Sequence, residues 1–335
     1  MNELATIKRP KAALAMHPHL PELLFSRQVR HDLDAMLQLH PKPITQEIAT
    51  DADLDELELL IGGWGCPLLD ERTLSRMPQL RAVIYTAGSV KGFATDELFR
   101  RGITVTSGVD INALPVAEFT LAAILMSGKR VFELACAYRT TKQFRPFEEE
   151  PYFWGNYGLK VGIVGASRIG RRVIELLAPF DVDPVFYDPF VTHEILGARP
   201  VTLDKLLRTS DVVSLHAPAI PETFHMIDSA ALSLMRSGTT LINTARGSLV
   251  DSDALLAELD SGRLNAVVDV TDPDPLPRHS PLFEAPNLLL TPHIAGSQGN
   301  ELRRLGDAAF REVSRFVGER PLLGKVKPEF LSYSA

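Results

Sequence analysis

The stretch VGIVGASRIGRRV, residues 161–173, decides the fold of this chain. It joins an apolar run to a helical pattern through G-A-S-R-I-G, which differs at one position from the dinucleotide-binding fingerprint G-x-G-x-x-G. The first and last glycines predict a tight turn and a close helix–strand approach, respectively. A serine replaces the second glycine, and its hydroxyl can donate to a phosphate oxygen beside the arginine that follows. We therefore expect nucleotide contacts from Gly165, Ser167, Arg168, Ile169 and Gly170.

Short apolar runs alternate with helix-length spacers along the whole chain. Apolar strands separated by helices predict parallel sheets covered on both faces, and six strands after a glycine-rich turn is the doubly wound count. The fold class is therefore α/β, with two doubly wound parallel-sheet domains. The expected strands lie within residues 11–16, 57–63, 80–88 and 102–108 of the first third, and within 159–165, 183–188, 211–217, 239–245, 265–270 and 287–293.

The order of the segments predicts that one domain is inserted into the other. A long apolar helix is expected over residues 115–140, with Pro115 in its first turn. An amphipathic helix over 300–319 follows the last strand and should return to the first domain. We expect shorter helices at 67–77 and 95–101 and a loop at 144–158. The boundaries are 1–111 with 299–335 for a substrate domain, and 112–298 for a nucleotide-binding domain.

Composition excludes several classes of function. The chain has 335 residues, 45% of them hydrophobic, and a net charge of −7. This charge argues against nucleic acid as the main partner. We find no apolar run approaching the roughly 20 residues of a membrane helix. Cys66 and Cys136 form no disulfide or metal-ligand pattern, so we expect free thiols in a reducing cytoplasm and no metal site.

Asp188 predicts which dinucleotide binds. It lies 188 − 170 = 18 residues after Gly170, at the end of the next expected strand. This is close to the offset of about 20 residues for the carboxylate that binds the adenosine ribose hydroxyls. A carboxylate there repels a 2′-phosphate, so NAD is favoured over NADP. Taken alone, Asp188 could equally be an ordinary turn residue before a proline.

Three later strand ends carry a set of residues suited to one reaction. Arg246 follows one strand, Asp269, Asp272 and Asp274 follow the next, and His293 follows the last. Arginine can grip the carboxylate of a 2-hydroxy acid with two parallel hydrogen bonds. Histidine is the general base suited to neutral pH, and a carboxylate beside it stabilises the imidazolium. Each residue alone has a structural interpretation, as a surface arginine, a backbone-bonded histidine or turn aspartates.

The motifs HAPAIPETFHMID, LMRSGTTLINTARGSLVD, DPDPLP and TPHIAGS resemble signatures of the D-isomer-specific 2-hydroxyacid dehydrogenase family. The resemblance covers most of residues 160–300, and the order of segments fits from about 60 to 317. It implies a Rossmann NAD-binding domain inserted into a flavodoxin-like substrate domain. It also implies an NAD(H) site between the two domains, and a cytoplasmic homodimer joined through the nucleotide domains.

The resemblance also assigns site residues. Arg246 and His293 match the family's catalytic positions directly, and the backbone of the segment YTAGSVKGF matches its substrate loop. Asp269 would face the nicotinamide amide. The implied cofactor contacts are His216, Ala217, Pro218, Thr223, Thr244, Ala245, Asp269 and Ala295, and the implied substrate contacts are Ala87, Gly88, Ser89, Arg246 and His293.

Two departures from the family pattern keep alternatives open. The family's glutamate falls at Asp274, one methylene shorter, which predicts a water between it and His293; Asp272 is the rival for this position. Ser167 replaces a glycine. The favoured function is a reductase of small 2-keto acids such as glyoxylate or hydroxypyruvate. The alternatives are a short phosphoglycerate dehydrogenase, for which Lys91 is the visible cation near the substrate loop, and a cofactor-sensing protein with little chemistry.

Overall fold

The computed structural model describes residues 9–46, 49, 54–143 and 155–330. The chain divides into two compact units. Unit 1 holds the described residues up to Asn112 together with those from Ser297 onward, and unit 2 runs from Ala113 to Gly296. The sequence places the same two divisions at 111/112 and 298/299, one and two residues away.

Unit 1 is built on a five-stranded parallel sheet with strand order β2-β1-β3-β4-β5. Its central strands are apolar along their whole length because helices cover both faces. Its strands are β1 (Lys11–Ala15), β2 (Gln38–Leu39), β3 (Leu59–Gly62), β4 (Ala82–Tyr85) and β5 (Thr104–Ser107), and its helices are α1 (Leu20–Leu24), α2 (Arg27–Met36), α3 (Glu71–Leu74), α4 (Asp96–Arg100) and α11 (Leu302–Val317).

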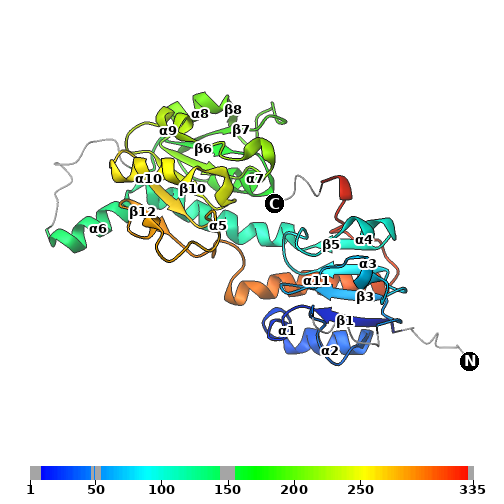
Figure 1. Ribbon diagram of the computed structural model, residues 1–335. Coiled ribbons are helices and arrows are strands. Elements are labelled where there is room, and N and C mark those ends of the chain that lie inside the picture. The colour runs from blue at the N-terminus through cyan, green and yellow to red at the C-terminus, as the bar shows by residue number, and fades with distance from the viewer. Residues whose placement is uncertain (1–8, 47–48, 50–53, 144–154, 331–335) are drawn as a thin grey trace, which may run out of the picture. The chain divides into compact units, whose positions relative to one another are not determined.

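The C-terminal helix α11 belongs to unit 1 although some 190 residues separate it from the rest of the unit (Figure 1). It packs against α1, α2 and β4. Leu305, Ala309 and Val313 form its buried stripe, which is the amphipathic face that the sequence predicts. Gly306 fits where a Cβ would stand 1.9 Å from the Leu24 carbonyl oxygen, so the two backbones touch.

Unit 2 is built on a seven-stranded parallel sheet with strand order β12-β11-β10-β9-β6-β7-β8. The order reverses at β6, so the carboxyl ends of β6 and β9 flank a topological switch point. Its strands are β6 (Leu159–Val164), β7 (Val182–Tyr187), β8 (Arg199–Pro200), β9 (Val212–Leu215), β10 (Thr240–Asn243), β11 (Asn265–Val268) and β12 (Leu288–Leu290), and its helices are α6 (Val131–Thr141), α7 (Arg168–Leu177), α8 (Leu203–Thr209), α9 (Ser229–Leu234) and α10 (Ser252–Asp260), with α5 (Val109–Gly128) entering from unit 1.

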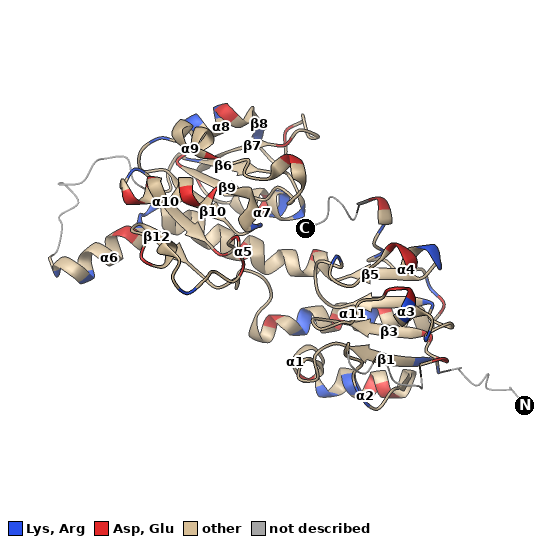
Figure 2. Cartoon of the chain, viewed as in Figure 1, with Lys and Arg blue, Asp and Glu red and all other residues tan. Residues whose placement is uncertain are grey.

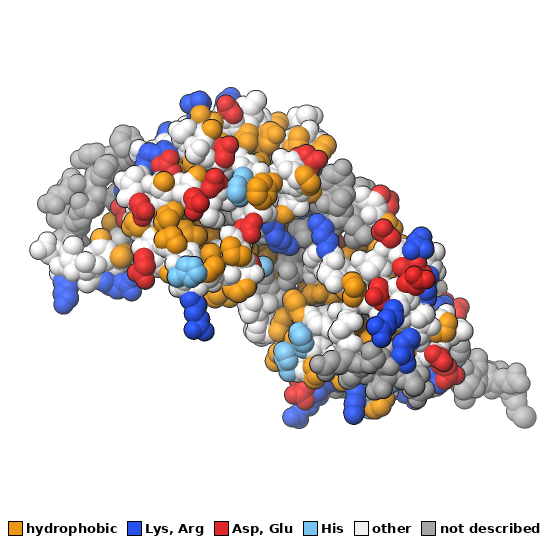
Figure 3. Space-filling model, viewed as in Figure 1, with side chains coloured by type: hydrophobic (Ala, Val, Ile, Leu, Met, Phe, Trp, Pro, Cys, Tyr) orange, Lys and Arg blue, Asp and Glu red, His pale blue; other side chains and the backbone are white. Residues whose placement is uncertain are grey.

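Two apolar clusters, one on each face of the sheet, form the core of unit 2. Val173, Ile174 and Leu177 of α7 pack on one face beside Ala117 and Ile124 of α5. Figure 2 shows that charged residues lie mostly on helices and loops, while the strands are largely uncharged. On the face drawn in Figure 3, Lys and Arg side chains are interspersed with Asp and Glu, without a continuous basic stripe on that face.

The single helix expected over 115–140 is wrong: two helices stand there. Arg130, with φ 51°, breaks the path between α5 and α6. Two carbonyls at the end of α5 accept hydrogen bonds from outside the helix. The Gly155 N–H donates to the Gly128 carbonyl at 2.8 Å, and the Asn156 side chain donates to the Leu125 carbonyl at 3.2 Å. These caps come from a segment some 30 residues away, so local sequence gives no sign of them.

α5 also begins earlier than expected, at Val109, whose N–H donates to the Ser107 hydroxyl at 3.2 Å. Pro115 therefore lies inside the helix rather than in its first turn. Within the described residues, α5 is the one helix long and apolar enough to cross a membrane by length and composition. The expectation that no apolar run approaches the length of a membrane helix is therefore wrong. Core helices of soluble proteins pass the same test, and Ala117 and Ile124 of α5 are completely buried.

Other differences are smaller. The strands β2 and β8 have two residues each, too few for a period to show in the sequence. The helix expected at 67–77 is only α3, because Leu69 first pairs with the Phe93–Ala94 backbone. Asp70 then caps α3 by accepting from Thr73 N–H at 2.8 Å. The loop expected at 144–158 lies mostly outside the described residues.

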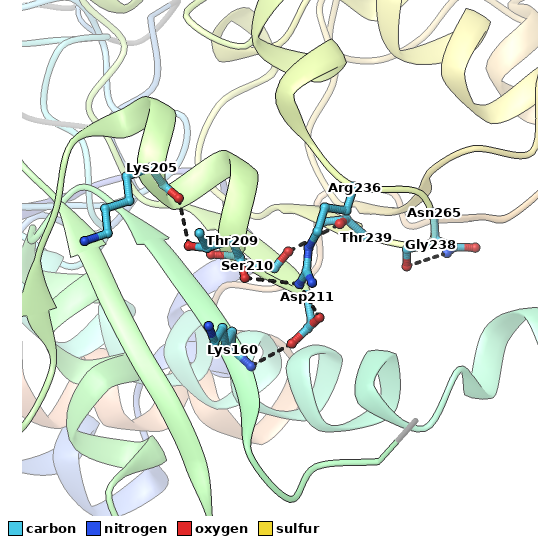
Figure 4. A network of polar contacts seen from close by, with 9 residues as sticks. All are labelled: Lys160, Lys205, Thr209, Ser210, Asp211, Arg236, Gly238, Thr239 and Asn265. Carbon is cyan, nitrogen blue, oxygen red and sulfur yellow. Dashed lines mark hydrogen bonds and ion pairs between the residues drawn. The ribbon is translucent and has the colours of Figure 1, made fainter. Parts of the chain in front are cut away.

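A polar network joins the amino ends of β6, β9 and β10 (Figure 4). The Asp211 carboxylate accepts from the Lys160 backbone N–H at 2.9 Å and from the Arg236 guanidinium at 2.5 Å. Arg236 also donates to the Thr209 carbonyl at 3.1 Å. This end of the sheet is therefore held by polar contacts, and its opposite, carboxyl end is where the candidate site lies.

Candidate functional site

The glycine-rich turn between β6 and α7 has the geometry that the fingerprint requires. Gly165 has φ +96°, and a Cβ there would stand 2.7 Å from the Ala217 backbone nitrogen. At Gly170 a Cβ would stand 2.0 Å from the Gly165 carbonyl oxygen, so only glycine lets α7 approach this closely. These two contacts explain both glycines by steric exclusion.

Ser167 takes the place of the second fingerprint glycine as the N-cap of α7. Its Oγ accepts from the Gly170 N–H at 3.4 Å, and its backbone is extended with φ −69°. A glycine's freedom is therefore not needed at this position. The hydroxyl hydrogen stays available for an outside acceptor, because the cap uses only the oxygen lone pair. Arg168 is exposed in the first turn of the same helix, and Ile169 beside it is half-buried.

Asp188, at the end of β7, braces the turn from the other side. One carboxylate oxygen accepts from the Ala166 N–H at 2.8 Å and the other from the Phe190 N–H at 2.9 Å. Each carboxylate oxygen has a second lone pair, so the group can still accept ribose hydroxyls. Asp188 thus fixes the distance between the carboxyl ends of β6 and β7 as well as presenting a negative charge there.

His216 follows β9 and is almost completely buried. Its Nε2 lies 3.0 Å from Ser214 Oγ, and its Nδ1 is buried without a partner among the described residues. Burial lowers the pKa of His216 to about 3, so the ring is neutral. Beyond it, the Thr223 hydroxyl donates to the Pro218 carbonyl at 2.6 Å and accepts from Ile220 N–H, which shapes the loop after β9.

These features together fit a dinucleotide. The turn leaves no room for a side chain at Gly165, the N-terminus of α7 follows the carboxyl end of β6, and a carboxylate stands at the neighbouring strand end. The unpartnered Nδ1 of His216 lies on the next strand end across the switch point. A site with these donors and this backbone approach suits NAD(H).

The loop after β10 carries Arg246. Asn243, buried at the end of the strand, braces this loop by donating to the Arg246 carbonyl at 2.9 Å and accepting from the Ala245 N–H at 3.1 Å. Thr244 Oγ1 lies 3.0 Å from Thr120 of α5. Gly247 is required because a Cβ there would stand 2.0 Å from the Thr271 carbonyl carbon. The loops after β10 and β11 are therefore in direct contact.

Asp269 organises the loop that follows β12. Its carboxylate is 2% exposed and accepts three hydrogen bonds, from Thr291 Oγ1 at 2.6 Å, Ile294 N–H at 2.8 Å and Ala295 N–H at 2.9 Å. The His293 N–H in addition donates to the Asp269 carbonyl at 2.9 Å. This is a role that the sequence analysis did not assign to Asp269.

His293 sits inside that loop in the left-handed region, with φ 56°. Such a conformation is uncommon for a residue other than glycine and persists where the surroundings fix it. Here the bonds to Asp269 on both sides of His293 fix it. The imidazole is half-exposed, with 52% of the side-chain surface accessible.

The side chains of Asp274 and His293 touch. Asp274 Oδ2 lies 2.6 Å from His293 Nδ1, a direct hydrogen bond. The expectation of a bridging water is therefore wrong: the left-handed backbone at His293 and the Pro-rich loop 272–277 bring the groups together despite the shorter stem. No contact of this kind joins Asp272 to His293 among the described residues.

Arg246 belongs to the same cluster. Burial lowers the pKa of its guanidinium, and the nearby Asp274 carboxylate opposes that shift. One of its nitrogens donates to the Ala245 carbonyl at 2.6 Å, which leaves its other N–H groups for an anion. The unit therefore gathers a half-buried cation and an Asp–His pair at neighbouring strand ends. Among the described residues, no group of three His, Cys, Asp or Glu side chains is arranged to hold a metal ion.

The expected substrate loop, Ala87–Ser89, lies in unit 1, after β4. The Gly108 N–H donates to the Ala87 carbonyl at 2.9 Å, and the Ser107 hydroxyl donates to the carbonyls of Ala87 and Gly88. The N–H groups of Ala87, Gly88 and Ser89 form no hydrogen bond with another described residue, so they are available as donors. Ser107 is a residue that the sequence analysis missed.

The chain is similar in sequence to a known family model and to several known proteins. A sequence model described as "D-isomer specific 2-hydroxyacid dehydrogenase, NAD binding domain" matches residues 121–295. A glyoxylate reductase of Thermofilum pendens is 34% identical over 262 residues, 76% of this chain and 77% of that protein. A glyoxylate/hydroxypyruvate reductase B of Yersinia enterocolitica is 32% identical over 296 residues, 84% of this chain and 90% of that protein.

A solved structure, that of a phosphoglycerate oxidoreductase from Rhizobium etli, superposes with a TM-score of 0.81 at 26% identity. The match covers 97% of this chain and all of that one. The chain therefore has a known fold, one that contains two parallel-sheet domains.

The burial of His216 predicts an acid-sensitive fold. Its pKa falls from 6.5 in the unfolded chain to about 3 in the folded one, so below pH 6.5 the unfolded state binds a proton that the folded state refuses. Proton uptake by the unfolded state therefore lowers the free energy of unfolding as the pH falls below 6.5, and has little effect above that pH. Between pH 7 and pH 5 this lowering amounts to about 2 kcal/mol. Urea unfolding of the wild-type protein and of His216→Gln at both pH values measures it.

We expect the wild-type protein to lose about 2 kcal/mol more than His216→Gln over this range. Replacement of the exposed His279 by Gln is the matched control and should leave the pH dependence unchanged. An equal loss in the wild-type protein and in His216→Gln would show that His216 takes up no extra proton on unfolding.

Proposed function

The chain belongs to the D-isomer-specific 2-hydroxyacid dehydrogenase family, and from that premise we propose that it reduces small 2-keto acids with NADH. The observation that carries the proposal is the direct hydrogen bond between Asp274 and His293 beside the half-buried Arg246. Reduction of a 2-keto acid requires a group that donates a proton to the keto oxygen and a group that binds the substrate carboxylate. His293 and Arg246 place both at neighbouring strand ends.

NAD(H), when bound, supplies the hydride. We assign its pyrophosphate to the α7 N-terminus, its adenosine ribose to Asp188, and the rest to the strand ends around the switch point. The assigned contacts are Gly165, Ser167, Arg168, Ile169, Gly170, Asp188, His216, Ala217, Pro218, Thr223, Thr244, Ala245, Asp269 and Ala295. The negative charge of Asp188 supports NAD over NADP, as proposed from the sequence.

His293 is the proposed acid. Asp274 accepts a hydrogen bond from the Nδ1–H of His293, so the ring presents Nε2 outward and exchanges its proton there. As the keto oxygen gains charge during reduction, His293 donates the Nε2 proton to it, and the Asp274 carboxylate stabilises the imidazolium before the transfer. In the reverse direction the neutral ring takes the hydroxyl proton. The left-handed backbone held by Asp269 sets the direction in which the ring points.

Arg246 is the proposed substrate grip. With one nitrogen committed to the Ala245 carbonyl, its remaining N–H groups can bind the substrate carboxylate. Its partial burial strengthens that bond, because a charge pair is screened less away from water. The Ala87–Ser89 backbone is assigned to the same substrate by resemblance, and that assignment remains a prediction.

The relatives direct the choice of substrate. Two of them are named as reductases of glyoxylate or hydroxypyruvate, which are both small 2-keto acids. The phosphoglycerate alternative is supported by the structure from Rhizobium etli, at lower identity. The sensing alternative would not require a hydrogen-bonded acid–base pair, so the Asp274–His293 contact favours catalysis.

We also propose a cytoplasmic homodimer joined through unit 2. Large apolar side chains are exposed along α5 and α6, at 45% for Met126, 38% for Val131 and 60% for Tyr138. Cys66 and Cys136 are free thiols, in keeping with a reducing compartment. A small organic acid and a second copy of the chain are the partners that these features support.

The proposed function is tested through Arg246. Arg246→Ala should bind NADH as the wild-type protein does and lose at least about a hundredfold in kcat/KM for keto-acid reduction, roughly 2.8 kcal/mol. Arg246→Lys should fall between the two, because lysine keeps the charge and loses the bidentate geometry. Steady-state NADH oxidation with glyoxylate, hydroxypyruvate and 3-phosphohydroxypyruvate, with NADH binding followed by fluorescence, gives both quantities.

Arg278 in the neighbouring exposed loop provides the control, and Arg278→Ala should keep wild-type kinetics. Near-normal kcat/KM in Arg246→Ala would remove Arg246 from the substrate site. Efficient turnover of the phosphorylated substrate alone would favour the phosphoglycerate alternative, and no turnover by the wild-type protein would favour a sensor.

The dimer is tested through α6. Val131→Asp places a charge on the proposed interface, so we expect it to shift the protein to monomer in size-exclusion chromatography with light scattering, at a concentration where the wild-type protein is dimeric. Leu196→Asp, at a residue 65% exposed elsewhere on unit 2, is the control and should stay dimeric. A monomeric wild-type protein would contradict the assignment.

A further inference from the structure

We propose that a pocket inside unit 1 binds a small organic anion. The pocket has a volume of about 410 Å³ and lies among the carboxyl ends of β4 and β5, the helix α11 and the C-terminal segment Arg320–Gly324. All of its lining residues belong to unit 1, and none is among the residues assigned above to the cofactor or the substrate. Its volume is in the range typical of small-molecule sites.

The wall formed by the C-terminal segment is fixed by hydrogen bonds. The Ser107 N–H donates to the Gly324 carbonyl at 3.0 Å, which adds the segment to the edge of the sheet beside β5. The Leu323 N–H donates to the Glu312 carboxylate at 2.9 Å, and Arg315 Nε donates to the Pro321 carbonyl at 2.6 Å. This wall of the pocket is therefore ordered backbone rather than a loose chain end.

The charges that line the pocket favour an anion. The lining includes three arginines, Arg311, Arg315 and Arg320, and two acidic residues, Asp110 and Glu312. The Glu312 carboxylate accepts a hydrogen bond from the Leu323 N–H, which fixes its position on the wall of the pocket. The Arg311 side chain forms no hydrogen bond or ion pair with any other described residue. Three arginines against two acidic residues give the lining a net positive charge, which favours an anionic ligand.

The rest of the lining specifies what the anion carries. Ile111, Ala308 and Leu323, which are at least partly exposed, give the pocket an apolar surface next to the arginines. An inorganic ion would leave that surface wet, whereas an apolar group of a few carbon atoms or one ring would cover it. The ligand class is therefore a carboxylate or phosphate on a short apolar body.

The pocket adjoins the expected substrate loop. Ser107 and Gly108 line it, and the same two residues hydrogen bond to the carbonyls of Ala87 and Gly88. A ligand in the pocket would therefore stiffen the loop through contacts one residue away. Binding itself is independent of the proposed function, and only an effect on turnover rests on it.

Isothermal titration with phenyl phosphate tests the site, with benzyl alcohol as the neutral analogue. We expect phenyl phosphate to bind the wild-type protein saturated with NADH, and benzyl alcohol not to bind. Arg311→Ala should weaken binding at least tenfold, about 1.4 kcal/mol, and Arg311→Lys should restore most of it. Arg27→Ala, which removes an exposed guanidinium of unit 1 outside the pocket, is the matched control and should bind as the wild-type protein does.

Arg246→Ala separates this site from the proposed catalytic one. Binding kept in Arg246→Ala and lost in Arg311→Ala supports the pocket, together with slowed hydrogen exchange at residues 87–89 on titration. Binding lost in Arg246→Ala and kept in Arg311→Ala would place the anion at the catalytic cluster and overturn the proposal. No binding by the wild-type protein up to about 10 mM would overturn it as well.

Discussion

The buried carboxylate of Asp269 is the interaction on which the candidate site depends. It accepts hydrogen bonds from both ends of the segment Thr291–Ala295, and so holds His293 between them in a conformation that the residue would not adopt alone. From that position the ring reaches Asp274 on the neighbouring loop. Gly247, which lets the loop of Arg246 touch Thr271, brings the cation to the same strand ends. A buried acceptor and one missing Cβ thus assemble three functional side chains.

Backbone contacts also determine the residues of the glycine-rich turn in the nucleotide site. Gly165 and Gly170 are dictated by distances of 2.7 and 2.0 Å to neighbouring backbone atoms, and Ser167 is permitted because its own backbone is extended. Sequence reasoning could find this turn because each of its requirements is local: a strand, two glycines and a helix within a dozen residues. The doubly wound order of unit 2 and the return of α11 to unit 1 followed from the same alternation of apolar runs and helices.

What the sequence could not show depends on contacts between distant segments. The break between α5 and α6 is capped by Gly155 and Asn156, and α3 is shortened by the pairing of Leu69 with Phe93 and Ala94. The direct Asp274–His293 contact was predicted to need a water because side-chain length was considered without the left-handed backbone at His293. The role of Asn243 could have been predicted, because a polar residue at the end of a buried strand usually hydrogen bonds to the loop that follows. The pocket beside α11 could not, because its walls are some 200 residues apart in the sequence.

The most direct test of the account is the pH dependence of keto-acid reduction, measured with NADH in the wild-type protein and in Asp274→Asn. If Asp274 stabilises the protonated His293 through the 2.6 Å hydrogen bond, the alkaline limb of the kcat/KM profile moves to lower pH in Asp274→Asn. Asp274→Glu, which keeps the charge, and Asp272→Asn, which lies outside the contact, should leave the limb where the wild-type protein has it. An unchanged limb in Asp274→Asn, or a shift in Asp272→Asn instead, would contradict the assignment of the acid–base pair on which the proposed function stands.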